Sequence, residues 1–103
     1  MTELPARLDI EVIEPRRLAL HGDLDAHTAS VLETELDQLG TSSPVHLMMA
    51  GVTFMDSTGI RGVVSAHGRH AEAGSCLLLV DPSDAVLRIL EITGLTDVLT
   101  LER

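Results

Sequence analysis

The chain has 103 residues, 45% of them hydrophobic and 22% charged, with a formal net charge of −9 at pH 7. This length and apolar content predict a single folded domain over residues 1–103 and exclude a disordered chain. Sixteen acids against seven bases argue against nucleic acid as a partner, because an acidic surface repels the phosphate backbone. A basic protein partner fits this charge better.

The scarcity of particular residue types excludes further classes of protein. Phe54 is the only aromatic residue, which disfavours base-stacking platforms and aromatic ligand cages and predicts an aliphatic core. All seven bases are arginine, so the chain has neither a P-loop lysine nor a Schiff-base lysine, and no cofactor is expected. The single Cys76 cannot form an internal disulfide, and no stretch is apolar enough for a signal peptide or a membrane helix. We therefore expect a cytoplasmic protein without membrane contact.

The beginning of the chain predicts a hairpin followed by a helix. Apolar and polar side chains alternate over residues 8–12, and a second apolar segment, 18–20, follows the turn-forming residues 14–16. Residues 26–39 then carry apolar side chains at helical spacing, and Gly40 stands where a left-handed helix cap is expected.

The middle of the chain predicts a strand, a helix and a second strand. Residues 45–49 form a short apolar run after a polar linker, which favours a central strand. A helical stripe of apolar side chains runs over residues 60–71 and is closed by Gly74. The continuous apolar run 76–80 is typical of a strand buried on both faces.

The end of the chain predicts a third helix and a last strand. The helix is expected to begin with Asp81 as its cap, Pro82 at its first position and Asp84 in its first turn. Gly94 is expected to end it, and residues 98–101 alternate as a short strand does.

This order of elements predicts an α/β domain with one mixed β-sheet. Right-handed crossovers make the later strands parallel beside an N-terminal antiparallel hairpin, and about three helices cover at least one face of the sheet. Partners and ligands of such sheets meet the loops at the carboxyl ends of the strands. Two loops have this position, residues 21–27 and residues 54–59.

The second of these loops contains two hydroxyl groups between a strand end and a helix start. In Asp56-Ser57-Thr58-Gly59, the acid and the hydroxyls are residue types that cap the unpaired amides of a helix N-terminus. The same amides and dipole also favour a phosphate, so Ser57 or Thr58 is a candidate phosphorylation site, with Arg61 one turn further on. A cap and a phosphate acceptor are compatible functions.

Two other chemistries have weaker support. Residues His21, Asp23, Asp25 and His27 alternate, as metal ligands can, yet no further ligand completes a site. Asp23 or Asp25 is better interpreted as a cap of the following helix or as part of a partner surface. Ser57 lacks both a nucleophile-elbow motif and an adjacent base, so we expect no catalytic residue and no metal site.

Three segments together resemble a known family. Residues 22–28 (GDLDAHT), 54–59 (FMDSTG) and 93–95 (TGL) occur in the order and spacing of anti-sigma factor antagonists of the STAS family, and the resemblance covers nearly the whole chain. It implies a STAS-like domain that acts as a switch and not as an enzyme. In the family's partner-switching systems, the unphosphorylated antagonist binds an anti-sigma factor serine kinase and so frees the sigma factor. Phosphorylation ends this binding, and a PP2C-type serine phosphatase restores it.

The resemblance also assigns roles by position. It implies phosphorylation at Ser57, with Thr58 as a second candidate. It further implies that Asp25 contacts the kinase and that the small Gly59 leaves space for the partner beside the helix start. The added phosphate would be held by helix amides and Arg61 while it repels the partner, so the fold need not change. The expected partner-binding set is Asp23, Asp25, Asp56, Ser57, Gly59 and Arg61.

The family leaves one functional alternative open. STAS domains also serve in lipid-transporter complexes, stressosomes and anion transporters, where an interaction module can act without a phosphorylation switch. Many members continue past the last strand with a further helix that packs back onto the domain. Because this chain ends at Arg103, we expect a minimal version of the domain, a dimer or a truncated chain, and a monomer or weak homodimer in solution.

Overall fold

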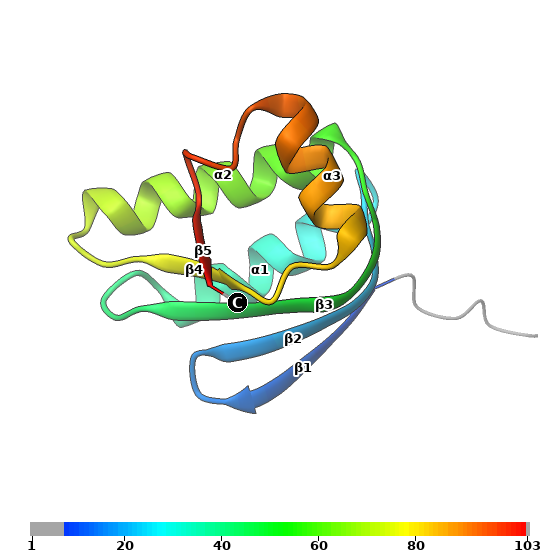
Figure 1. Cartoon of the computed structure of the whole chain (residues 1–103). Helices are drawn as coiled ribbons and strands as arrows, with labels where there is room; N and C mark the ends of the chain where they lie inside the picture. The colour runs from blue at the N-terminus through cyan, green and yellow to red at the C-terminus, as the bar shows by residue number, and fades with distance from the viewer. Residues whose placement is uncertain (1–7, 103) are drawn as a thin grey trace, which may run out of the picture.

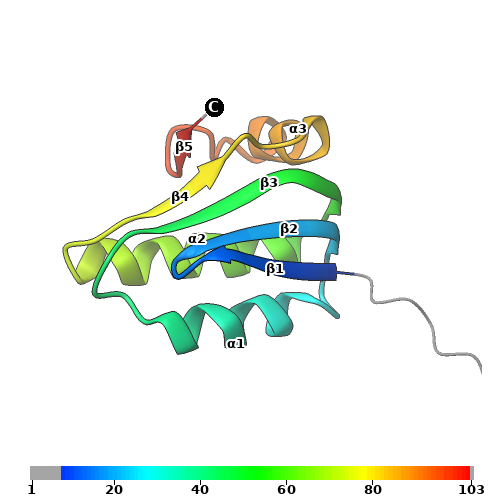
Figure 2. The same cartoon turned by 90° about the horizontal axis from the view of Figure 1, so that it is seen from below.

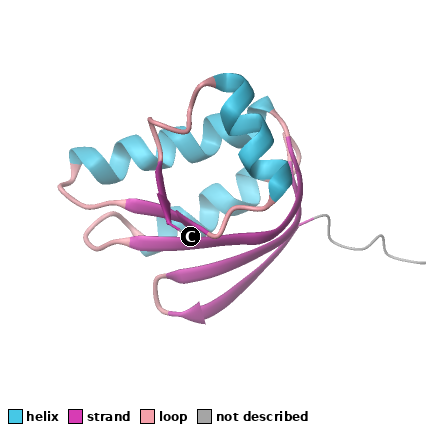
Figure 3. Cartoon of the chain, in the orientation of Figure 1, coloured by secondary structure: helices cyan, strands magenta, loops and turns pink. Residues whose placement is uncertain are grey.

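The computed structural model describes residues 8–102, which form one α/β domain (Figures 1 and 3). The strands are β1 (Leu8–Glu14), β2 (Arg17–Leu24), β3 (Val45–Met55), β4 (Leu77–Val80) and β5 (Thr100–Glu102). The helices are α1 (Ala29–Leu39), α2 (Ser57–Glu72) and α3 (Asp84–Thr93). The predicted order of elements is confirmed, while residues 1–7 and 103 of the predicted domain lie outside the described residues.

The sheet is mixed, as predicted. Its strand order is β1-β2-β3-β4-β5, with β1 antiparallel to β2 and each later pair parallel. Every parallel crossover therefore advances in the same direction across the sheet, and right-handed crossovers of this kind place their helices on the same face. Figure 2 shows the strands fanned out from β1 to β4, with α1 drawn on the β1 side of the molecule and α3 beside β5 on the opposite side.

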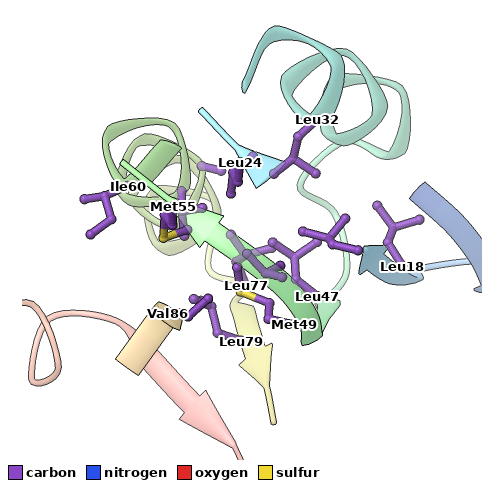
Figure 4. Close-up of a cluster of buried hydrophobic side chains, with 14 of the residues drawn as sticks. Leu18, Leu24, Leu32, Leu47, Met49, Met55, Ile60, Leu77, Leu79 and Val86 are labelled. Atoms are coloured by element: carbon purple, nitrogen blue, oxygen red, sulfur yellow. The ribbon is translucent and has the colours of Figure 1, made fainter. Parts of the chain in front are cut away.

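The core lies between the sheet and the helices and is aliphatic, as expected. Alternate residues of the three central strands point into it, and each is at most 1% exposed: Leu18, Leu20, Leu47, Met49, Leu77 and Leu79. Leu32 of α1, Ile60 of α2 and Val86 of α3 close the cluster from the helix side (Figure 4). Phe54, the only aromatic residue, lies outside the core with 48% of its surface exposed.

Three element boundaries differ from the prediction near the candidate loops. Strand β2 continues to Leu24, so residues 21–24 of the predicted loop 21–27 are part of the strand. The first helix begins at Ala29 and not at residue 26, because residues 26–28 form a separate turn. Strand β3 continues to Met55, six residues beyond the predicted end at residue 49. The longer strand brings its carboxyl end directly to Asp56.

The start of the third helix also differs from the prediction. Its N-cap is Ser83, whose hydroxyl accepts a hydrogen bond from the Val86 amide at 3.3 Å. Asp81 has φ +50° and precedes the helix, so it is not the cap, and Pro82 is not the first helical residue. Asp84 lies in the first turn as predicted. Gly94 ends this helix in the left-handed conformation, as predicted, with φ +72°.

The last strand is shifted as well. β5 comprises Thr100–Glu102, whereas residues 98–101 were expected, and Leu99 is buried just before the strand begins. Strand β4 begins at Leu77, one residue later than the predicted run 76–80. Cys76 therefore lies just before the strand and is half-buried. Within residues 8–102, none of the helices combines the length and the apolar character required to cross a bilayer.

Candidate functional site

The two predicted loops meet at one end of the sheet. β2 and β3 run parallel, and their last residues are paired, Asp23 with Phe54 and Leu24 with Met55. Beyond this register the Asp56 amide donates to the Leu24 carbonyl at 3.3 Å. The carboxyl ends of the strands therefore hold the loop after β2 against the start of α2, as the sequence predicted.

Asp56 caps α2. Its backbone is extended, and its Oδ1 accepts hydrogen bonds from the amides of Thr58 at 2.9 Å and Gly59 at 3.0 Å. Two of the four amides that a helix start leaves unpaired are thus satisfied by one carboxylate. The cap interpretation of this motif is confirmed, and the capping residue is the acid, not either hydroxyl.

Ser57 is the first residue of α2, and its side chain is exposed. Thr58, the second residue, is only half-exposed. Within residues 8–102 neither hydroxyl takes part in a hydrogen bond of the fold, since Asp56 provides the cap. Of the two candidate acceptors, Ser57 therefore presents its hydroxyl more openly.

Gly59 is buried, and its lack of a side chain is required by the chain itself. A Cβ at this position would lie 2.3 Å from the Leu24 carbonyl oxygen and 3.0 Å from Leu24 Cγ. The first turn of α2 therefore rests directly on the end of β2. The space that Gly59 leaves is filled by Leu24, so this glycine positions the helix start.

Asp25 is also turned inward, with 6% of its surface exposed. Its Oδ1 accepts from the His27 amide at 2.9 Å and from the Thr28 amide at 3.1 Å. The Thr28 hydroxyl, within 3.2 Å of the same carboxylate oxygen, lies closer to the Asp23 carbonyl, at 2.7 Å. Asp25 thus caps the turn that precedes α1, whereas Thr28, the N-cap of α1 itself, makes no side-chain cap bond.

The remaining predicted partner-binding residues lie nearer the surface. Asp23 is half-buried, and its Oδ1 accepts a hydrogen bond from the exposed Thr53 hydroxyl at 3.2 Å, which links the ends of β2 and β3. Arg61 is exposed on α2, one turn after Ser57. The side chains of Asp23, Ser57 and Arg61 are thus the accessible members of the expected set, together with the half-buried Asp56.

The residues weighed as metal ligands do not converge. His21 lies against the neighbouring strand, where a Cβ on Gly51 would be 2.3 Å from His21 Nδ1, and its Nε2 is 3.9 Å from Glu11 of β1. Asp25 is engaged in its own turn, as described above. In the part of the chain that the structure describes, no three His, Cys, Asp or Glu side chains are placed to hold a metal ion.

Two neighbours of the site were not among the expected partner-binding residues. Phe54 lies in the predicted loop 54–59, but it was not among the expected partner-binding residues, and the structure shows that its side chain is exposed. The β4–α3 loop is tied to the same region, because the Ser83 hydroxyl donates to the Val52 carbonyl at 2.6 Å. An aromatic residue at the carboxyl end of a strand was the available signal for the first, since such ends carry binding surfaces.

Known proteins share this sequence pattern and fold. The STAS domain family matches residues 8–103. The anti-sigma-B factor antagonist of Listeria monocytogenes is 32% identical over 83 residues, which cover 79% of this chain and 73% of that protein.

Solved structures agree in fold at lower identity. An anti-sigma factor antagonist from Mycobacterium paratuberculosis has a TM-score of 0.75 at 19% identity, covering 92% of this chain and 83% of its own. The Bacillus cell fate determinant SpoIIAA in its phosphorylated form has a TM-score of 0.65 at 16% identity, covering 93% and 91%. Its unphosphorylated form has a TM-score of 0.71 at 18% identity, covering 93% and 88%. With the family match over residues 8–103, the chain belongs to the STAS domain family, among its anti-sigma factor antagonists.

Proposed function

We propose that this protein is the antagonist in a partner-switching system. In its unphosphorylated form it binds an anti-sigma factor that is a serine kinase, and this binding releases the sigma factor. Phosphorylation of Ser57 ends the binding, and a PP2C-type serine phosphatase restores it. The antagonist role is supported by the 32% identical relative from Listeria monocytogenes, which is named an anti-sigma-B factor antagonist.

The observation that carries the switch is the position of Ser57. Its exposed side chain opens a 16-residue helix at the end of the sheet where β2 and β3 finish. A kinase that binds this end of the molecule has the Ser57 hydroxyl within its contact surface. The same residue is therefore both part of the binding surface and the group that phosphorylation changes.

The geometry of the cap decides where a phosphate on Ser57 would go. Asp56 already occupies the Thr58 and Gly59 amides, so these two donors are not available to the phosphate. This limits the helix-amide support expected from the sequence and leaves Arg61, one helical turn after Ser57, as the candidate cation on the same helix. The phosphate would stay at the surface beside the Asp56 carboxylate.

A surface phosphate at this place acts against a partner. It adds a charge of about −1.5 to −2 at neutral pH. A partner that packs against Ser57 must then desolvate that charge without a matching donor, which costs several kcal/mol. Because the partner surface is formed by exposed side chains and not by the core, the fold itself need not change for binding to be lost.

In this proposal the protein is a binding module that catalyses no reaction itself. Purified protein incubated with ATP alone should gain no phosphate, whereas addition of the anti-sigma kinase should add one phosphoryl group. Self-phosphorylation in the absence of any other protein would contradict this assignment. We also propose that the protein acts in the cytoplasm, where sigma factors act, as a monomer or weak homodimer.

The binding test uses three proteins that differ only at residue 57. Wild type and Ser57→Ala should bind the cognate anti-sigma factor with similar affinity in a calorimetric titration, while Ser57→Asp should bind at least about tenfold more weakly. Equal affinities for Ser57→Ala and Ser57→Asp would refute the switch at this residue. Failure of all three to bind any anti-sigma factor would favour a STAS interaction module of a stressosome or lipid-transporter complex.

A further inference from the structure

We propose that the apolar groove between the end of β3 and helix α3 is a second contact for the same anti-sigma factor, and that it takes an apolar side chain flanked by a basic residue. This inference rests on the proposed function and extends it from Ser57 to the neighbouring surface. The β3–α3 groove has a volume of about 540 Å³. Its apolar lining consists of Phe54 and Met55 from β3 and Ala85, Ile89 and Ile92 from α3.

The rim of the groove carries apolar surface that the fold leaves uncovered. Ile92 is 77% exposed and Phe54 is 48% exposed, although both are large hydrophobic side chains. A groove of this size, with apolar walls and few polar groups, is suited to bury an inserted side chain. Such buried apolar contacts near the middle of an interface supply a large share of binding energy.

The groove is continuous with the proposed switch surface. Phe54 and Met55 line it and directly precede Asp56, which caps the helix that begins with Ser57. Helix α3 is fixed beside this strand by the Ser83 hydroxyl, which donates to the Val52 carbonyl. A partner that covers Ser57 therefore reaches the groove without a separate binding event.

The acidic residues around the groove favour a basic partner over a second copy of this chain. Asp84 lines the groove, Asp23 lies at the carboxyl end of β2, and Asp56 and Asp81 directly follow β3 and β4. Arg88 is the only cation in the lining. A second copy of this chain, which carries a net charge of −9, would bring like charges together, whereas a basic side chain beside the inserted residue would meet this acidic end of the sheet.

The first test is Ile92→Asp, with Ile13→Asp as a matched control. Ile92 is exposed on α3, so the substitution should leave the fold intact, and the buried charge should weaken binding to the anti-sigma factor at least about tenfold. Ile13 is 52% exposed at the far end of the β1–β2 hairpin, where the register shifts. Its substitution should leave the affinity unchanged.

A second variant tests the groove without adding charge. Ala85→Leu places a larger apolar side chain in the lining and should exclude the partner's side chain, again weakening binding. Circular dichroism of each variant checks that helix α3 is retained. Wild-type affinity for both Ile92→Asp and Ala85→Leu would overturn the groove contact.

The outcomes separate this inference from the proposed function. If wild type binds the anti-sigma factor and Ser57→Asp does not, while both groove variants bind normally, the switch stands and the groove contact is wrong. If the wild-type protein binds no anti-sigma factor, the proposed function is wrong, and the groove contact that rests on it is wrong as well. If Ile92→Asp and Ala85→Leu abolish self-association in sedimentation and not anti-sigma binding, the occupant is a second copy and the inference is overturned.

Discussion

Two adjacent hydroxyl residues at the start of α2 differ in how far their side chains are exposed. Ser57 is exposed at the first helical position, whereas Thr58 is half-exposed and uses its amide to bind Asp56. A kinase must bring the acceptor oxygen to within bonding distance of a phosphoryl group, which favours the more open side chain. The structure thus gives a physical reason for preferring Ser57, which the motif alone could not supply.

This preference makes a prediction about acceptor choice. Incubation with the anti-sigma kinase and ATP should add one phosphoryl group to wild type and to Thr58→Ala, and none to Ser57→Ala. Intact-mass spectrometry reads the result directly. Full modification of Ser57→Ala, with the phosphate mapped to Thr58, would show that the second hydroxyl is the acceptor.

Gly59 offers a stability test at residue scale. Gly59→Ala would place a methyl group against the Leu24 carbonyl, so the backbone of α2 or β2 must shift, and we expect a loss of about 1–3 kcal/mol in the free energy of unfolding. Gly68→Ala in the same helix is the matched control, because a Cβ added there would meet no atom within 4 Å beyond its chain neighbours and its own helix backbone.

The control should behave in the opposite direction. Gly68→Ala should stabilise the protein by up to about 1 kcal/mol, since alanine favours the helix. Denaturant unfolding of the two variants measures both changes. Equal effects of the two substitutions would mean that the close approach of α2 to β2 is not a constraint on the fold.

Residue roles could be predicted from the sequence only where they depend on local spacing. The Asp56 cap follows from an acid placed just before a helical stripe, and the structure confirms it. Asp25 follows the same rule, because its carboxylate accepts from amides only two and three residues further on, and a capping role was one of its two interpretations. The internal contact of Gly59 depends on Leu24, 35 residues earlier in the chain, and has no signature in the sequence.

At the scale of elements, one arginine holds the loop after α1. The Arg16 guanidinium lies in the β1–β2 turn and donates to four carbonyls, those of Leu39 at 2.6 Å, Gly40 at 2.9 Å, Ser43 at 2.6 Å and Pro44 at 3.2 Å. These carbonyls follow the C-terminus of the helix, where a cation is favourable. The hairpin and the entry to β3 are joined by this side chain.

We expect Arg16→Ala to lower the free energy of unfolding by about 2–3 kcal/mol, because several carbonyls lose a charged donor at once. Arg17→Ala is the matched control: Arg17 is also half-buried, in β2, but makes no comparable set of bonds within residues 8–102. Thermal unfolding of the two variants compares them. A larger loss in Arg17→Ala than in Arg16→Ala would contradict this role.

Element boundaries were predicted least well where two local signals compete. The apolar run 45–49 predicted a strand, but the run ends before Gly51, which β3 contains. A Cβ on Gly51 would lie 2.8 Å from the Leu20 carbonyl oxygen and 2.3 Å from His21 Nδ1, so the close approach of β2 favours glycine there. At the third helix, Asp81, Ser83 and Pro82 all resemble helix-start residues. The structure selects Ser83 because its hydroxyl is fixed to β3 through the Val52 carbonyl, a contact that spans 31 residues of sequence.

At the scale of the whole molecule, the proposed switch lies at one end of the sheet and at the surface, outside the buried core. The proposed contacts lie at the carboxyl ends of β2 and β3 and along α3, whereas the buried leucines fill the space between the sheet and the helices (Figures 1 and 4). A phosphate on Ser57 therefore changes a surface and not the packing beneath it. The switch should act by altering the partner's contact, without a second conformation of the domain.

This separation predicts a local response to phosphorylation. In NMR spectra of the phosphorylated protein, amide shifts should change at residues 54–61 and in the neighbouring loop 23–28. The amides of β4, Leu77–Val80, should keep their positions. Shift changes of similar size throughout the core would point instead to a global rearrangement.

The central claim, that Ser57 is a reversible phosphorylation site controlling a partner, is tested most directly in the protein's own cells. Intact-mass and peptide-mapping spectrometry, before and after a stress, should find one phosphoryl group on the peptide that contains Ser57 and Thr58. Its occupancy should change with the stress, and the phosphate should map to Ser57. A protein that is never phosphorylated there, under any condition in which it is expressed, would contradict the switch.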